Sequence, residues 1–228
     1  AAAGGYSIAR SLRFNSADSA YLSRAVSTAS NRKTWTFSAW IKRASLATQT
    51  GLLGAGTNAS NISVIFLGTD GTIWYYDYVG GSFASKVATT AVYRDFSAWM
   101  HVLVAVDTTQ GTASNRVRIY INGSEVTAFS TATYPSPNAD TFINSATTHT
   151  ISKESDFYAN YGNMYVADVH LIDGQQLPPT SFGSFDTNNV WQPSAYSGTY
   201  GTNGGHWTFE DNSNNTATTL GKDSAGSN

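Results

Sequence analysis

The segment from residue 116 to residue 129, RVRIYINGSEVTAF, limits the possible fold more than any other stretch of the chain. Val117, Ile119 and Ile121 alternate with polar or amphipathic neighbours, so a strand here has one apolar face. Asn122-Gly123 follows, and these residue types tolerate the positive φ angles that a type I′ hairpin turn requires. We therefore predict an antiparallel hairpin whose second strand occupies the rest of the segment, with the three apolar residues facing a core.

The same alternation recurs along the chain, with turn residues between the runs. Residues 35–42, WTFSAWIK, place apolar side chains on one face, and residues 100–107, MHVLVAVD, are nearly all apolar, as in a strand covered on both faces. Further strands are expected at residues 6–14, 21–22, 51–55, 62–67, 73–79, 149–152, 164–173 and 206–210. Roughly ten strands with almost no helix favour an all-β fold, a two-layer antiparallel β-sandwich, because a single open sheet leaves its apolar face uncovered.

Composition agrees with one such domain and excludes several classes of partner. Aromatic residues make up 13% and charged residues only 12% of the 228 residues, which suits short strands and polar turns better than amphipathic helices. The net charge of -2 offers no basic surface for nucleic acid. Because no apolar run reaches about 18 residues, we expect no membrane insertion. The absence of Cys excludes disulfides, thiolate metal sites and thiol catalysis.

Five segments, in this order, resemble the laminin G-like branch of the concanavalin A-like lectin/glucanase superfamily. They are TWTFSAWIKRASL, LGTDGTIWYY, FSAWMHVLVAVD, RVRIYINGSEV and NMYVADVHLIDG. The positions that match the recurring motifs of the family are Trp40, Trp99, His101, Tyr120, Asn122 and Gly123. The resemblance implies a concanavalin A-like jelly roll. Where the family often has an Asp in its late strand this chain has Ala167, with Asp168 one place later, so we carry no metal role over to that position.

The resemblance and the composition together suggest three parts. Residues 1–177 are expected to form the laminin G-like domain, and residues 178–211 an extension that packs on the sandwich or follows it. Residues 212–228 are rich in Gly, Asn and Ser and are predicted to be a polar linker or tail. The start, AAAGGYSIAR, lacks the charged-then-apolar order of a secretory signal.

The segments AAAGGYSIARSLRF, TNGGHWTFEDNS and TTLGKDSAGSN also resemble structural proteins of tailed bacteriophages. This resemblance implies a location in the virion, as part of a tail fibre, a spike or the capsid surface; an extracellular location is the alternative. It implies other virion proteins as partners, and a homo-oligomer or several copies per particle.

Catalytic and metal-binding patterns are weak. Glucanase members of the superfamily carry a Glu-x-Asp-x-(x)-Glu run with its carboxylates on one strand face, and this chain has none. The acidic pairs at residues 154/156 and 210/211 are expected to be solvated loop carboxylates. Asp168 and His170 share a strand face and are interpreted as a partly exposed structural pair, because no third catalytic partner can be assigned. We expect no enzyme activity, and a polysaccharide-cleaving enzyme is the alternative.

Cofactors are not expected either. The four His residues lack zinc-site spacing. Calcium is the alternative, since several lectin-like jelly rolls hold Ca²⁺ through loop oxygen atoms. The loop candidates are Asp70, Asp107, Asp140 and Asp156, for which turn capping is the favoured interpretation.

Aromatic residues beside polar ones give the sharpest binding hypothesis. A sugar ring presents apolar faces bordered by hydroxyl groups, so its site needs an exposed Trp or Tyr next to hydrogen-bonding groups. The candidates are Trp74, Tyr76, Asp77 and Tyr78 in one expected strand, and Tyr158, Asn160 and Tyr161 in an expected loop. For the strand group, packing in the sandwich core is the stronger alternative; for the loop group, the two interpretations stay open. Core packing is assigned to Trp35, Phe37, Trp40 and Trp99.

The function that combines these expectations is a non-enzymatic virion module with a lectin-like surface that binds host cell-surface glycan. A purely architectural virion protein without glycan binding is the first alternative. The expected hairpin at residues 116–129 belongs to the scaffold, and recognition is expected on loops.

Overall fold

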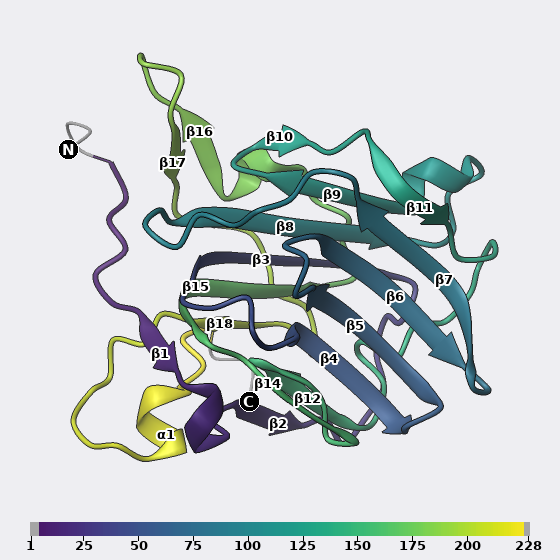
Figure 1. Ribbon diagram of the computed structural model, residues 1–228, viewed down its shortest axis with the longest axis horizontal. Coiled ribbons are helices and arrows are strands. Elements are labelled where there is room, and N and C mark those ends of the chain that lie inside the picture. Colours follow the sequence, from purple (N-terminus) through teal and green to yellow (C-terminus); the bar gives the residue numbers. More distant parts are fainter. Residues whose placement is uncertain (1–4, 226–228) are drawn as a thin grey trace.

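The computed structural model describes residues 5–225 as two antiparallel sheets packed face to face (Figure 1). Sheet A has the order β1 (Leu12–Phe14), β15 (Met164–Asp173), β3 (Thr34–Arg43), β8 (Met100–Asp107), β9 (Val117–Ile121) and β10 (Ser124–Glu125), and β18 (Gly205–Trp207) also pairs with β15. Sheet B has the order β11 (Phe129–Thr133), β7 (Ser82–Thr89), β6 (Ile73–Val79), β5 (Asn61–Leu67), β4 (Thr50–Asn58), β12 (Thr148–Ile151) and β2 (Leu22–Ala25). Residues 1–4 and 226–228, the outer ends of the expected first domain and tail, lie outside the described residues.

The core lies between the two sheets. Alternate residues of β3 point into it, and Trp35 meets Tyr75 of β6 edge to face with ring centroids 5.7 Å apart. Burial of each such side chain stabilises the fold by about 1.5–3 kcal/mol. Other members from both sheets include Phe37, Ile41, Leu53, Ile65, Val87, Val104, Ile119 and Val166. The predicted two-layer antiparallel β-sandwich is confirmed.

The predicted hairpin forms from β9 and β10. Asn122 and Gly123 have φ angles of 47° and 77°, as a type I′ turn requires. Val117 and Ile119 are buried in the core and Ile121 is half-buried. The second strand is shorter than predicted, because the chain leaves sheet A after β10 and joins the edge of sheet B as β11, where it pairs with β7.

Most strands with clear alternation form as predicted, and the differences lie at weak patterns. The predicted strand at residues 6–14 is reduced to β1, and the one at residues 206–210 to β18. The sequence did not indicate β7, the hairpin of β13 (Lys153–Ser155) and β14 (Tyr158–Tyr161), or the hairpin of β16 (Gly183–Phe185) and β17 (Trp191–Pro193). The tail region contains a short helix, α1 (Ala217–Leu220). No helix within residues 5–225 is long and apolar enough to cross a membrane.

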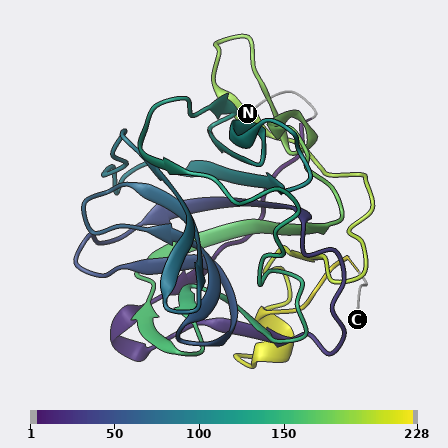
Figure 2. The same cartoon turned by 90° about the vertical axis from the view of Figure 1, so that its right-hand side faces the viewer.

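Residues after β15 cover the outer face of sheet A. This segment passes through the short 3₁₀ helix Pro179–Ser181, places Phe182 on the sheet, and continues to β18. Beneath it lies a second apolar cluster of Leu103, Ala105, Tyr120, Ile172 and Phe182. β8 is therefore buried on both faces, as its apolar sequence predicts. Figure 2 shows the tip of the β16–β17 hairpin standing clear of both sheets.

The β13–β14 hairpin covers part of the outer face of sheet B. β13 crosses β4 at Gly51 and Gly54, where any Cβ atom would collide with the backbone of Lys153 and Glu154. These two glycines therefore permit the close approach of one backbone to another. The hairpin also contacts β5.

Candidate functional site

The alternating aromatic side chains of β6 divide between the core and the outer face of sheet B. Tyr75 points into the core, whereas Trp74, Tyr76 and Tyr78 point outward. The preferred interpretation that these three fill the sandwich core is therefore wrong. Both faces of IWYYDYV carry aromatic residues, so alternation alone could not identify the inner face.

Asp77 lies on the inner face of β6 and is separate from this surface. Its side chain is buried and accepts hydrogen bonds from the Ser63 hydroxyl at 2.5 Å, the Ser85 hydroxyl at 2.5 Å and the Tyr75 hydroxyl at 2.7 Å. Burial raises the pKa of the Asp77 carboxyl group, although the three hydrogen bonds oppose this shift. The structure therefore gives Asp77 a structural role in place of the predicted contact with sugar.

The outward side chains form a continuous aromatic strip, here called the aromatic platform: Phe66, Trp74, Tyr76, Tyr78 and Phe83. Ring centroids are 5.4 Å apart for Phe66 and Trp74, 5.4 Å for Tyr76 and Phe83, and 5.1 Å for Tyr78 and Phe83. Phe83 is 51% exposed, and Trp74 and Tyr78 are half-buried. Phe66 and Tyr76 are buried, so only Trp74, Tyr78 and Phe83 offer ring surface to solvent, which is what stacking of a sugar ring requires.

Polar groups border the aromatic platform. The Lys86 ammonium lies 3.9 Å from the centre of the Trp74 ring and 5.1 Å from that of Phe83, in cation–π contact with both. Glu154 is buried and accepts hydrogen bonds from the Tyr76 hydroxyl and the Asn160 amide. Burial and the adjacent Glu154 charge raise the pKa of Tyr76, so its hydroxyl remains a donor. The expectation that Glu154 is a solvated loop carboxylate is wrong.

The second predicted group belongs to strand β14, whereas a loop was expected. Tyr158 packs at the margin of the aromatic platform, and its hydroxyl donates to the Ala59 carbonyl at 2.8 Å. Asn160 reaches the platform indirectly, through Glu154. Tyr161 instead lies beside Tyr21, with ring centroids 5.9 Å apart. The structure thus joins Tyr158 to the outward residues of β6 and leaves Tyr161 elsewhere.

Sequence reasoning missed three residues of this surface: Phe66, Phe83 and Lys86. The available signal was Gly80-Gly81, which suits a hairpin turn directly after β6. A strand placed after that turn puts Phe83 opposite Tyr78, and the structure pairs these two residues.

The four calcium candidates do not fit one calcium site. Asp70 and Asp107 each cap a turn, accepting hydrogen bonds from the backbone N–H and hydroxyl of the threonine two residues later. Asp140 forms ion pairs with Arg32 and Lys33 at 3.7 and 3.5 Å, and Asp156 forms one with Lys153 at 3.4 Å. Each carboxylate is thus engaged by groups near it, and the four belong to different loops.

A groove of about 810 Å³ lies on the other side of the molecule, over sheet A. Its walls are residues 5–11 and the β16–β17 hairpin, and its lining includes Trp40, Trp99 and Trp191. Trp99 is 39% exposed, so its assignment to core packing is wrong, and Trp40 is only half-buried. The same assignment is confirmed for Trp35 and Phe37, which are buried in the core.

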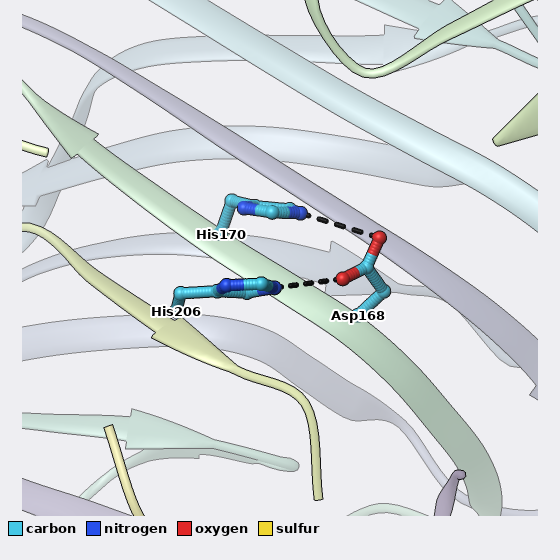
Figure 3. A group of neighbouring side chains, drawn as sticks. All are labelled: Asp168, His170 and His206. Carbon is cyan, nitrogen blue, oxygen red and sulfur yellow. Dashed lines mark hydrogen bonds and ion pairs between the residues drawn. The ribbon is translucent and has the colours of Figure 1, made fainter. Parts of the chain in front are cut away.

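Asp168, His170 and His206 meet on the outer face of sheet A (Figure 3). Asp168 Oδ1 lies 2.7 Å from His206 Nε2, and Asp168 Oδ2 lies 3.3 Å from His170 Nε2. Tyr6 donates a hydrogen bond to Asp168 Oδ1 at 2.9 Å. Burial acts to raise the pKa of Asp168, but its close contacts with His170 and His206 and the hydrogen bond from Tyr6 outweigh it and lower that pKa, which keeps the carboxylate ionised. The predicted pairing of Asp168 with His170 is present, but both residues are buried and the expectation of a partly exposed pair is wrong. His206 was missed.

Backbone geometry explains how this cluster forms. Asp168 has a φ of 47° where the pairing of β15 with β3 shifts register, which marks a β-bulge. The bulge re-aims the Asp168 side chain toward His170. His206 arrives from β18, where it pairs directly with His170.

Comparison with known proteins identifies the family. Residues 14–174 match the family described as the concanavalin A-like lectin/glucanases superfamily, and the chain belongs to it. No curated protein sequence matches the chain.

Solved structures share the fold at low sequence identity. Domains LG4-5 of the mouse laminin α1 chain superpose with a TM-score of 0.53 at 16% identity, over 88% of this chain and 49% of the laminin fragment. Domain 4 of AbnA, an extracellular arabinanase from Geobacillus stearothermophilus solved in complex with arabinotriose, gives a TM-score of 0.52 at 15% identity, over 70% of this chain and 69% of that domain. The chain thus spans about half of the laminin fragment.

Proposed function

We propose that this protein is a non-enzymatic carbohydrate-binding module and that the aromatic platform is its sugar site. The observation that carries the proposal is a strip of aromatic rings on the outer face of β5, β6 and β7, with Phe83 exposed and Lys86 beside Trp74. These rings lie on the face of sheet B that points away from the core, so they do not contribute to packing between the two sheets. Large aromatic side chains at a surface are typical of binding sites.

The chemistry of the aromatic platform matches an oligosaccharide. Trp74 and Phe83 offer ring faces for the apolar side of a sugar, and the Tyr78 hydroxyl and Lys86 ammonium can bond to its oxygen atoms. Lys86 also favours sugars that carry a carboxylate. The arabinotriose complex of AbnA domain 4 supports the proposal, because that domain has the same fold.

We propose binding without cleavage because the bordering carboxylate is already engaged. Glu154 uses one oxygen atom to accept from Tyr76 and the other to accept from Asn160. A general acid or a nucleophile needs a carboxyl oxygen that can reach the glycosidic bond. A polysaccharide-cleaving enzyme remains the alternative, and release of reducing ends from a bound polysaccharide would establish it.

The setting that we propose is a bacteriophage particle, in which the module binds host cell-surface glycan. The support is the resemblance of the segments near both ends to structural proteins of tailed phages. Several copies per particle would raise the avidity of a weak sugar site by multivalency. Immuno-electron microscopy of purified particles tests this setting and distinguishes a tail from a capsid location. A protein absent from particles would contradict it, and one present without glycan affinity would favour the purely architectural alternative.

The binding proposal is tested by two tryptophan variants on an array of bacterial polysaccharides and arabino-oligosaccharides. Trp74→Ala removes a central ring of the aromatic platform and is expected to weaken binding by about 10- to 100-fold, or about 1.4–2.8 kcal/mol. Trp99→Ala removes an exposed ring from the groove over sheet A and is expected to leave binding unchanged. The reverse pattern would assign the sugar site to the groove, and loss in neither variant would contradict both locations.

A further inference from the structure

Asp168, His170 and His206 bring three potential metal ligands to one point. Among the described residues they form a group whose ligand atoms all lie within 4.8 Å of one another. In Figure 3 both imidazole rings direct Nε2 toward the same carboxylate. We infer that this cluster is a binding site for one divalent transition-metal ion, with zinc as the ion that two imidazoles and a carboxylate suit best.

The hydrogen bonds of the cluster leave one ligand atom without a partner. His170 is buried, and its Nε2 makes no hydrogen bond to any described residue although it faces Asp168 Oδ2 at 3.3 Å. A buried polar atom without a partner is destabilising, and native proteins seldom keep one without a reason. A metal ion between Nε2 and the carboxylate would satisfy this atom.

The surroundings of His170 match those of a metal ligand. Its other ring nitrogen, Nδ1, lies 2.9 Å from the Tyr200 hydroxyl. A hydroxyl at this position fixes the orientation of the ring and can hold the proton on Nδ1, which leaves Nε2 as the coordinating atom. The His206 ring stacks on His170 with centroids 4.1 Å apart, so both rings are held in place before an ion arrives.

An ion can enter this site from one side. His206 and Tyr6 are half-buried, whereas Asp168 and His170 are buried. Tyr6 also lines the groove over sheet A, so the open side of the cluster adjoins that groove. Three protein ligands leave a fourth position for water or for a ligand atom in the groove. Such an ion would join β18 to β15 and hold the end of the extension on the sheet.

The test uses the full chain without a histidine tag, freed of metal with a chelator. Calorimetric titration with Zn²⁺ is expected to show one site per chain, and thermal unfolding is expected to shift upward with Zn²⁺ but not with Ca²⁺. Co²⁺ in place of Zn²⁺ is expected to give visible absorption bands of a site with nitrogen and oxygen ligands, a signal that does not depend on stability.

Two variants and one control assign the binding. His206→Gln alters a half-buried ligand, and Asp168→Asn keeps a residue type that tolerates the positive φ of the bulge. Each is expected to weaken Zn²⁺ binding by at least about tenfold and to reduce the Co²⁺ bands. His149→Gln, in sheet B, removes a histidine outside the cluster and is expected to change neither. The inference would be overturned if the unaltered chain showed no saturable binding of either ion. It would also be overturned if His206→Gln and Asp168→Asn bound Zn²⁺ as tightly as the unaltered chain.

Discussion

Trp74 and Tyr75 are neighbours in the chain that have opposite environments in the fold. Tyr75 is fully buried against Trp35, whereas Trp74 lies on the outer face of sheet B beside Lys86. Residue type does not separate them, since both are large and aromatic. Only the pairing of β6 with its neighbours decides which of the two could contact a ligand.

His149 shows the same dependence of chemistry on environment. It is buried in β12, and its Nε2 accepts a hydrogen bond from the Asn144 backbone N–H, so the ring must be neutral. Burial lowers the pKa of His149 from 6.5 to about 4. Between these two pH values the unfolded chain binds a proton at this residue that the folded chain does not. The free energy of unfolding therefore falls as the pH decreases through this window.

We predict that His149→Gln reduces the acid sensitivity of the fold. Glutamine can accept the hydrogen bond from the Asn144 N–H and has no charge to gain. As the pH falls, the wild type loses about 1.4 kcal/mol of unfolding free energy per pH unit at this residue, about 3 kcal/mol in total at pH 4, and the variant does not. Urea unfolding at several pH values between 7 and 4 measures the difference between variant and wild type. A constant difference across this range would show that His149 titrates normally in the folded chain.

At the scale of elements, the β9–β10 hairpin has a second role beyond its turn. Trp191 of β17 packs directly over Gly123, so that a Cβ atom there would collide with the indole ring. The glycine is thus required both by its positive φ and by the contact with the extension. Gly80 has a positive φ of 60° too, but a Cβ atom there would meet nothing within 4 Å.

We predict different costs for alanine at these two glycines. Gly80→Ala is expected to lower the free energy of unfolding by about 1 kcal/mol, the cost of a left-handed backbone for a residue with a Cβ atom. Gly123→Ala carries the same cost and adds about 1–3 kcal/mol for displacement of Trp191. Urea denaturation of both variants measures the difference. Equal costs would show that the Trp191 contact contributes nothing to stability.

The elements that sequence could and could not predict differ in a physical way. β3, β8 and β15 carry continuous alternation or apolar runs, and they were predicted almost to their ends. β13 and β14 are three and four residues long and rich in polar side chains. Their position depends on Gly51 and Gly54 of β4, a tertiary contact that no local pattern reports. The same applies to the pairing of β18 with β15, which brings His206 to Asp168 and His170.

At the scale of the whole molecule, the sandwich and the extension depend on each other. Leu103, Ala105 and Ile172 lie on the outer face of sheet A, and each is no more than 1% exposed because the extension covers them. The part of the chain that matches the superfamily ends at residue 174, before this cover begins. The sequence predicted an extension at residues 178–211, but the family resemblance did not indicate which face of the sandwich the extension covers.

We predict that a chain ending at residue 177 is not a stable soluble monomer. Removal of the extension exposes the second apolar cluster, including Tyr120, and removes the pairing of β18 with β15. Size-exclusion chromatography and binding of a dye that reports exposed apolar surface are expected to show aggregation. A monomer with an unchanged unfolding temperature would show that the extension is not needed for the fold.

The sequence was sufficient for the class of fold and for the family, but not for the surface of the site. Its pattern indicated three platform residues as binding candidates, Trp74, Tyr76 and Tyr78, but favoured packing in the core for all three. Phe83 and Lys86 come from β7, whose Ser and Ala residues give a weak strand pattern. The aromatic platform forms only after β7 pairs with β6, so a local pattern could suggest the proposed site but could not establish it.

The central claim is that glycan binds to the outer face of sheet B. The six tryptophans give separate indole N–H signals in a ¹H–¹⁵N spectrum of the labelled chain, and single Trp→Phe variants assign them. On addition of a glycan that the array identifies, we predict that the Trp74 signal shifts with saturation, while the signals of Trp40, Trp99 and Trp191 in the groove stay in place. Shifts in the groove tryptophans with an unchanged Trp74 signal would contradict the claim.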